Sequence, residues 1–252
     1  MKSNAGCGTR SSSQVARRLA APVVAVAALM APHAGVAAAA PDAVAANPGP
    51  SCPDIQVVFA RGTFEAPGVG ATGQAFVDAL NARLPGENIA VYGVNYPASL
   101  DFGAAANGIV DASSEVESVA ANCPNTKIVL GGYSQGAAVV AYTTEDAVPP
   151  GFNLPAGITG PMAPEVANHV AAVALFGKPS SGFLQMIYTG APPITVGRLY
   201  SEKTTDLCIP EDNVCSPTGS DNGAHTLYAQ NGMADQAADF AARRVLSNGR
   251  TT

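Results

Sequence analysis

The sequence GYSQG occupies residues 132–136 and is the most informative feature of the chain. It follows an apolar run at residues 127–130, typical of a buried strand, and precedes an alanine-rich stretch at residues 137–143, typical of a helix. A G-x-S-x-G turn between a strand and a helix is the pattern of a nucleophile elbow. Its glycines permit a strained, crowded backbone, and the serine hydroxyl lies above the sheet edge. The sequence therefore predicts that Ser134 is a nucleophile. The base, the acid and the oxyanion donors that such a serine needs have to come from other parts of the chain.

Strand-like and helix-like segments alternate along the chain. Strands are expected at residues 55–60, 88–96, 127–130, 170–176 and 196–200, and helices at residues 73–84, 102–121, 137–143 and 233–246. Such alternation predicts an α/β fold, a three-layer sandwich whose mostly parallel, five-stranded sheet has helices on both faces. Right-handed crossovers favour the strand order 2-1-3-4-5. Two connections rich in proline and glycine, residues 148–164 and 178–195, are expected to be loops that line a cleft.

The first 40 residues have the composition of a secretory signal. They contain four basic residues and no acidic one, and their apolar segment, residues 19–30, is too short to span a bilayer. We expect residues 1–40 to be a signal peptide, cleaved between about residues 39 and 46. Residues 41–51 would then form a flexible lead, and residues 52–248 a single catalytic domain. The expected location is extracellular or associated with the cell envelope.

The chain that remains after residue 40 is acidic. It keeps 9 basic and 19 acidic residues, a net charge of −10. This charge repels phosphate backbones, so nucleic acid is not expected as a partner. No later segment resembles a membrane span, so no stable membrane anchor is expected. Roughly 210 residues fit one domain, and we expect a monomer.

Four cysteines remain after the signal: Cys52, Cys123, Cys208 and Cys215. An even number in an exported protein favours two disulfides over a metal site. Cys208 and Cys215 can close a short loop. Cys52 and Cys123 each precede a strand, and in the expected order these two strands are neighbours about 4.8 Å apart. The expected pairs are therefore Cys52–Cys123 and Cys208–Cys215, with no metal or other cofactor.

A serine nucleophile needs a base to take its proton, and histidine is the usual base near neutral pH. Two histidines follow the signal. His169 directly precedes the strand expected at residues 170–176, which places it at the sheet edge away from Ser134 and predicts a structural role. His225 lies in a loop after the last strand, at the same end of the sheet as Ser134, so His225 is the candidate base.

The acid of a catalytic triad is expected between the serine and the histidine in the chain. The candidates near the last strand are Glu202, Asp206, Glu211, Asp212 and Asp221. Asp212 lies inside the loop that Cys208 and Cys215 would close, and such a cross-link would hold a carboxylate firmly against the imidazole. We favour Asp212 over Asp206 for this reason. Reasoning from the residues alone does not decide between these two carboxylates.

The oxyanion of an acyl-transfer reaction needs preorganised donors, usually the amide after the nucleophile and one from the loop after an early strand. The first donor would be Gln135. The second is expected within residues 61–65, where Thr63 offers an amide and a hydroxyl, although these residues also fit a simple polar loop.

Two alternative functions, which are not those of an esterase, also have to be considered. GVGATG, at residues 68–73, has the form of a dinucleotide-binding motif. Its first glycine comes too late after the strand, and the second strand ends without a carboxylate for a ribose, so we do not favour this interpretation. The other rival is a non-catalytic secreted binding protein on a hydrolase fold.

With these residues in place, residues 52–246 resemble the cutinase family of serine esterases, in particular the secreted cutinase-like proteins of actinobacteria. The resemblance rests on ARGT at residues 60–63, GYSQG at residues 132–136, the C-x3-D-x2-C loop at residues 208–215, and His225 before the last helix. It implies a cutinase-like α/β-hydrolase fold without a lid domain. It also implies Ser134 as nucleophile, Asp212 as acid, His225 as base, Thr63 and Gln135 as the oxyanion hole, and the two disulfides named above.

The resemblance further implies hydrolysis of carboxylic esters through an acyl-enzyme. The ester substrate would be a cutin-like polyester, a short to medium acyl ester or a lipid, and acetylxylan is the alternative within the same fold. Apolar residues on two segments are expected to form a rim for acyl chains, although they fit ordinary core positions equally well: Phe183, Leu184, Met186, Ile187, Tyr188, Leu227 and Tyr228.

Overall fold

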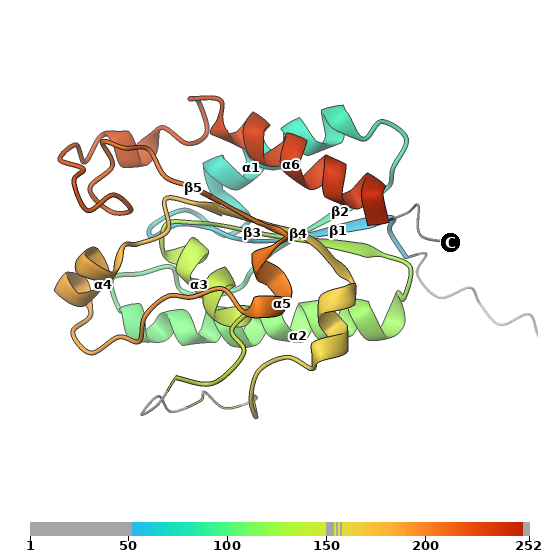
Figure 1. Cartoon of the computed structure of the whole chain (residues 1–252), viewed down its shortest axis with the longest axis horizontal. Helices are drawn as coiled ribbons and strands as arrows, with labels where there is room; N and C mark the ends of the chain where they lie inside the picture. The colour runs from blue at the N-terminus through green and yellow to red at the C-terminus, as the bar shows by residue number, and fades with distance from the viewer. Residues whose placement is uncertain (1–51, 150–153, 155, 157, 249–252) are drawn as a thin grey trace, which may run out of the picture. The chain divides into compact units, whose positions relative to one another are not determined.

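A central sheet between two layers of helices forms the body of the protein (Figure 1). The computed structural model describes residues 52–149, 154, 156 and 158–248. The expected signal, residues 1–40, and lead, residues 41–51, lie outside the described residues. Helices α1 and α6 cover one face of the sheet, and α2 and α3 cover the other (Figure 1). The prediction of a three-layer α/β sandwich is confirmed.

All five strands are parallel, in the order β2-β1-β3-β4-β5, as predicted. The strands are β1 Ile55–Ala60, β2 Ile89–Gly93, β3 Lys127–Tyr133, β4 Val170–Phe176 and β5 Thr204–Leu207. The α-helices are α1 Gly70–Arg83, α2 Ala106–Asn122, α3 Gln135–Thr143, α4 Ser181–Ile187, α5 Arg198–Ser201 and α6 Met233–Asn248. Short 3₁₀ helices are η1 Phe102–Ala105, η2 Pro164–Asn168 and η3 Ala224–Thr226.

The core has one half on each face of the sheet. Strands β1 and β4 are buried along their whole length, because helices cover both of their faces. On the α1/α6 face, the rings of Phe59, Phe76 and Phe176 pack with centroids 5.9 to 6.2 Å apart. On the α2/α3 face, Val139 packs against strand residues such as Leu130. Residues of β1, β3 and β4 therefore pack in the core on both faces of the sheet.

The predicted fifth strand at residues 196–200 is wrong. These residues lead into α5, where the Asp146 carboxylate accepts from the Arg198 amide at 3.1 Å and pairs with its guanidinium at 2.9 Å. The fifth strand is β5, an edge strand in which only Leu207 is buried. Its sequence, TTDL, therefore lacks the apolar run that identifies a central strand.

The connection at residues 178–195, predicted as a loop, contains helix α4. The Ser180 hydroxyl accepts a hydrogen bond from the Phe183 amide at 3.3 Å, which caps the first turn of the helix. A helix of this length depends on packing as well as propensity, so it leaves a weak signal in the sequence.

The two disulfides join the pairs that were expected. Cys52–Cys123 links the segments that precede β1 and β3, with Cα atoms 5.6 Å apart, at the end of the sheet opposite Ser134. Cys208–Cys215 closes the loop after β5, with Cα atoms 5.8 Å apart. One bridge therefore fastens the start of the sheet, and the other fastens a loop at its far end.

We predict that the bridge with the longer span contributes more to stability. Cys52 and Cys123 are 71 residues apart and Cys208 and Cys215 only 7, so the first pair restricts the unfolded chain more. Its replacement by two alanines should lower the free energy of unfolding by about 4 kcal/mol, and replacement of the second pair by about 2 kcal/mol. Urea unfolding followed by circular dichroism measures both, and an equal or reversed ranking would contradict the prediction.

Candidate active site

Ser134 lies at a strained turn between β3 and α3. Its backbone has φ 55° and ψ −119°, a region that non-glycine residues seldom occupy. The flanking glycines make this turn possible. A Cβ atom on Gly132 would collide with the carbonyl oxygen of Gly136, and one on Gly136 would collide with that of Ala60 on the neighbouring strand. The turn therefore has the packing expected of a nucleophile elbow.

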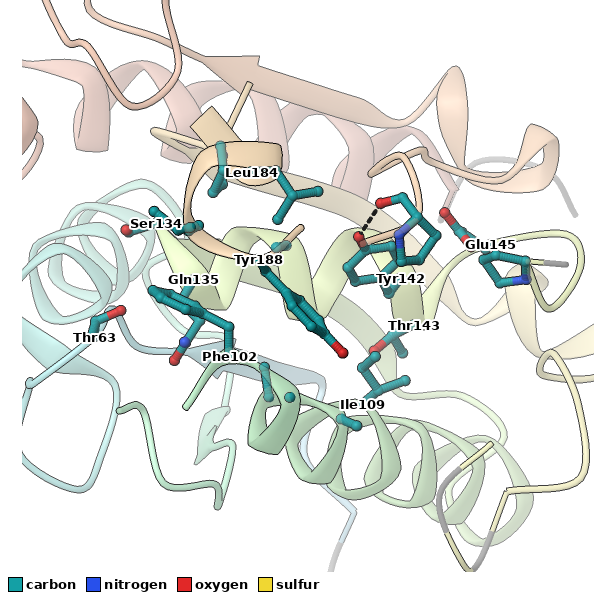
Figure 2. A pocket seen from close by; sticks show the side chains of 18 of the residues that line it. Thr63, Phe102, Ile109, Ser134, Gln135, Tyr142, Thr143, Glu145, Leu184 and Tyr188 are labelled. Carbon is teal, nitrogen blue, oxygen red and sulfur yellow. Dashed lines mark hydrogen bonds between the residues drawn. The ribbon is translucent and has the colours of Figure 1, made fainter. Parts of the chain in front are cut away.

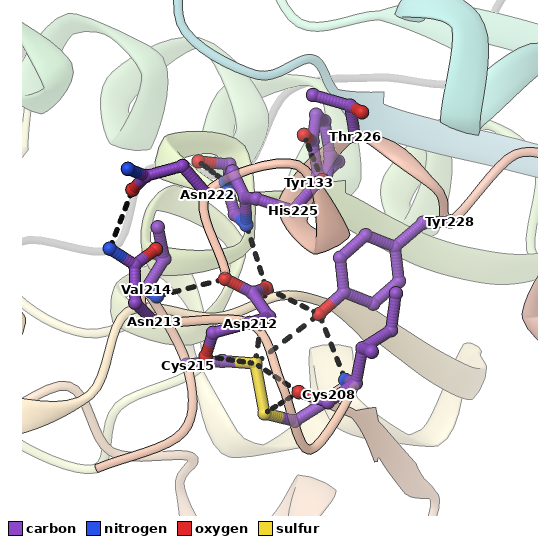
Figure 3. A network of polar contacts seen from close by, with 12 residues as sticks. Tyr133, Cys208, Asp212, Asn213, Val214, Cys215, Asn222, His225, Thr226 and Tyr228 are labelled. Atoms are coloured by element: carbon purple, nitrogen blue, oxygen red, sulfur yellow. Dashed lines mark hydrogen bonds and ion pairs between the residues drawn. A yellow bond between two sulfur atoms is a disulfide. The ribbon is translucent and has the colours of Figure 1, made fainter. Parts of the chain in front are cut away.

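A continuous chain of hydrogen bonds connects Ser134, His225 and Asp212. The Ser134 Oγ atom lies 2.8 Å from Nε2 of His225. Nδ1 of His225 lies 2.7 Å from Oδ2 of Asp212 (Figure 3). The three residues come from the end of β3, from η3 and from the disulfide-closed loop after β5. With the imidazole proton on Nδ1, Nε2 is free to accept the serine proton.

The Asp212 carboxylate is fully buried and has several donors. Oδ1 accepts from the Val214 amide at 2.8 Å, and Oδ2 accepts from the Tyr228 hydroxyl at 2.7 Å as well as from His225 (Figure 3). Burial, followed by the hydrogen bond to Asp212, raises the pKa of Tyr228 above its ordinary value. The hydroxyl therefore stays protonated, and it donates to the buried charge, which needs such partners.

Two of the alternative acids have other partners. Asp206, on β5, is partly exposed and forms an ion pair with Lys178 at 3.3 Å. Asp221 is exposed, and its carboxylate accepts from the Gly223 amide at 2.7 Å. His169, the other histidine, precedes β4 at the end of the sheet opposite Ser134. Of the residues left open by the sequence, the structure brings Asp212 and His225 to Ser134.

Two tyrosines hold the histidine and the acid, and sequence reasoning missed both roles. The Tyr133 hydroxyl donates to the His225 carbonyl at 2.6 Å, and the two rings lie 5.1 Å apart. Tyr133 occupies the variable second position of G-x-S-x-G, which gave no signal. The prediction of Tyr228 as a rim residue is wrong, because its side chain is fully buried and its hydroxyl contacts Asp212 and the Ile209 amide.

The expected oxyanion donors belong to the cavity that contains Ser134. Thr63 and Gln135 line the same cavity as Ser134 (Figure 2). Gln135 begins α3, so its amide belongs to the first helical turn, where backbone N–H groups lack helical partners. Its side-chain amide donates to the Ser99 carbonyl at 2.9 Å.

A buried arginine and a partly buried glutamate hold the loop that carries Thr63. The guanidinium of Arg61 donates to the carbonyls of Glu65 at 2.8 Å and Tyr96 at 2.7 Å. The Glu65 carboxylate accepts from the Gly62 amide at 2.6 Å and from an amide in the first turn of α1 at 2.7 Å. A dinucleotide phosphate would need that same helix N-terminus, which supports rejection of the dinucleotide interpretation. Within the described residues, no group of three or more His, Cys, Asp or Glu side chains is arranged to hold a metal ion.

A cavity of about 300 Å³ extends from Ser134 (Figure 2). Four of the expected rim residues line it, all from α4 or the residue that follows: Phe183, Leu184, Ile187 and Tyr188. Met186 and Leu227 are exposed and are not among the residues that line it, so their place on the rim stays a prediction. Met186 lies on the same short helix as Leu184 and Ile187 but not on its cavity side, and this distinction requires the tertiary structure.

Comparison with known proteins decides the family. Residues 51–245 match the family model described as Cutinase. The chain belongs to the cutinase family. Among its relatives, Carboxylesterase Culp1 of Mycobacterium tuberculosis is 52% identical over 196 residues, which cover 77% of this chain and 82% of Culp1. Phospholipase Culp4 of the same organism is 41% identical over 241 residues, which cover 96% of this chain and 94% of Culp4.

A solved acetylxylan esterase has the same fold as this cutinase-family chain. The two are 26% identical with a TM-score of 0.62, and the match covers 77% of this chain and all of that structure. These findings confirm the prediction of a carboxylic ester hydrolase of the cutinase family.

We predict that the elbow of this cutinase-family protein requires glycine at position 136. Gly136→Ala should lower the free energy of unfolding by about 1–3 kcal/mol, because the added methyl group overlaps backbone atoms of β1. Thermal unfolding measures the effect. Gly182→Ala in α4 is the matched control, since a Cβ atom there meets no atom within 4 Å. Equal stability of the two variants would show that the turn tolerates a side chain.

Proposed function

We propose that the protein is a secreted serine esterase that hydrolyses carboxylic esters through a Ser134–His225–Asp212 triad. The observation that carries the proposal is the unbroken hydrogen-bond chain from a buried carboxylate through an imidazole to a serine hydroxyl, at distances of 2.7 and 2.8 Å. The serine also lies at the end of a cavity with room for a substrate. A non-catalytic binding protein has no need of this arrangement.

In the proposed reaction, Ser134 Oγ attacks the ester carbonyl while Nε2 of His225 takes its proton. Asp212 stabilises the imidazolium that forms, and the amides of Gln135 and Thr63 donate to the oxyanion. Collapse of the tetrahedral intermediate expels the alcohol, which receives the proton from His225. Water, deprotonated by His225, then attacks the acyl-enzyme and releases the acid and the free serine. No metal or cofactor takes part in this sequence.

We propose acyl esters or lipids as the substrate class. The relatives named carboxylesterase and phospholipase fit this class, and so does the apolar character of residues such as Leu184 and Ile187 that line the cavity. An acetylxylan substrate is less favoured, because an acetyl group is much smaller than the cavity.

We also propose that the protein is exported and acts as a monomer without a membrane anchor. The basic and apolar pattern of residues 1–40 supports export, as do the two disulfides. Among the helices of the described residues, none is long and apolar enough to cross a bilayer.

A pair of aspartate variants tests the proposed acid. Asp212→Asn should reduce kcat for a nitrophenyl ester by about 10³- to 10⁴-fold, because a neutral amide neither fixes the histidine tautomer nor stabilises the imidazolium. Asp206→Asn is the matched control and should retain kcat within about twofold, since it removes only a partly exposed ion pair. Circular dichroism checks that both variants fold. A large loss in Asp206→Asn with full activity in Asp212→Asn would assign the acid to Asp206.

A further inference from the structure

The connection that follows β2, residues 94–99, supports the loop that follows β1. The guanidinium of Arg61 donates to the carbonyls of Val94 at 3.3 Å and Tyr96 at 2.7 Å, and it lies over the Tyr96 ring, 5.2 Å from the centroid. In return, the Tyr96 hydroxyl donates to the Arg61 carbonyl. Both residues are buried, and burial raises the pKa of Tyr96 above its ordinary value, so the hydroxyl stays a donor. Arg61 and Tyr96 therefore hold each other through hydrogen bonds in both directions.

The same connection also reaches both proposed oxyanion donors. The amide of Phe64, the residue after Thr63, donates to the Ala98 carbonyl at 2.7 Å. The next carbonyl along the chain, that of Ser99, accepts from the side-chain amide of Gln135 at 2.9 Å. Thr63 and Gln135 follow different strands, yet the connection after β2 holds both of them in place.

Backbone strain is concentrated at these contacts. Within the part of the chain that the structure describes, three non-glycine residues have a positive φ: Ser134 at 55°, Phe64 at 66° and Ala98 at 49°. Side chains seldom tolerate such angles, and residues keep them only where the surrounding structure imposes them. The strained residues are thus the proposed nucleophile and the two partners of the hydrogen bond between the loops. A connection with only a structural role has no need of such strain.

Close packing links the loop after β1 to the nucleophile elbow. A Cβ atom on Gly62 would lie 2.6 Å from the ring of Tyr133, the residue before Ser134. A Cβ atom on Gly136 would lie 2.5 Å from the carbonyl oxygen of Arg61, the same oxygen that accepts from the Tyr96 hydroxyl. The two loops and the elbow therefore have little room to move relative to one another.

We propose that Arg61 and Tyr96 are positioning residues for the reaction. They fix the connection at residues 94–99, which in turn holds Thr63 and Gln135 where the oxyanion forms. Preorganised donors stabilise a transition state because they need not reorient as charge develops on the carbonyl oxygen. The inference rests on the proposed function, since it takes the amides of these two residues as the oxyanion donors. Loss of a contact in this frame should weaken transition-state stabilisation and leave binding of the ester unchanged.

Removal of a single hydroxyl tests the frame with little disturbance of the fold. Tyr96→Phe deletes the donor to the Arg61 carbonyl and keeps the buried ring. We expect kcat and kcat/KM for nitrophenyl butyrate to fall together by about 5- to 10-fold, with KM unchanged within about twofold. Such a pattern marks an interaction that acts in the transition state alone.

Thr126→Val is the matched control for this variant. It also removes a buried hydroxyl that donates to a carbonyl, that of Pro53 at 2.6 Å, but at the end of the sheet opposite Ser134. It should retain kcat within about twofold. Unchanged kcat in folded Tyr96→Phe, or an equal loss in Thr126→Val, would overturn the positioning role while leaving the esterase function intact.

A second variant changes the other partner. Arg61→Lys keeps the charge but replaces the planar fork by one ammonium group, which cannot reach the carbonyls of Glu65, Val94 and Tyr96 together. It should lower kcat by about 10- to 100-fold, again with KM within about twofold. Circular dichroism checks its fold, and if Arg61→Lys does not fold, Tyr96→Phe decides alone. A folded Arg61→Lys protein with full activity would overturn the proposal.

An inhibitor that mimics the intermediate separates positioning from a general loss of structure. With a trifluoromethyl ketone, Oγ of Ser134 adds to the ketone carbon, its proton passes to His225, and the former carbonyl oxygen keeps the negative charge. Tyr96→Phe should raise the inhibition constant by the same factor by which it lowers kcat, because both depend on the oxyanion donors. An unchanged inhibition constant beside a lowered kcat would overturn the positioning role. If the unmodified protein neither hydrolyses esters nor binds the ketone, the proposed function fails, and the positioning role fails with it.

Discussion

A fully buried carboxylate, that of Asp212, is the constraint on which the rest of the site depends. An unpaired charge without water costs much free energy, so the protein has to surround it with donors. The donors are the Val214 amide, the Tyr228 hydroxyl and Nδ1 of His225. All three belong to residues 208–228, and the Cys208–Cys215 bridge cross-links the first part of this segment. Because this segment cannot shift without losing those bonds, His225 is kept within hydrogen-bond distance of Ser134.

The sheet brings this segment to Ser134. In a parallel sheet all strands end at the same edge, and the order β2-β1-β3-β4-β5 places the loop after β1 beside the elbow after β3. Contact between Gly136 and the β1 backbone is so close that no side chain fits between them. The same elbow begins α3, whose cavity side runs from Ser134 to Glu145. The position of Ser134, that of the loop that carries Thr63 and one wall of the cavity are therefore consequences of one strand-to-helix connection.

Much of this arrangement was predictable from the sequence, and the failures have physical causes. Central strands leave apolar runs in the sequence, so the order of the sheet could be predicted. Cysteines at the starts of adjacent strands indicated one disulfide, and the short spacing of the other two cysteines indicated the second. The edge strand β5 was misplaced because only one of its four residues is buried. Tyr228 was misassigned because an aromatic residue near the site fits a rim or a core position equally well, and only the tertiary structure shows its hydroxyl on Asp212.

Labelling with a fluorophosphonate tests the proposed triad, because this reagent reacts with a serine only when a neighbouring base activates it. Peptide mass spectrometry of the labelled protein locates the adduct. We expect one adduct per chain, on Ser134, and its loss in His225→Ala but not in His169→Ala. An adduct on another serine, or none on a folded and correctly bridged protein, would contradict the proposed triad.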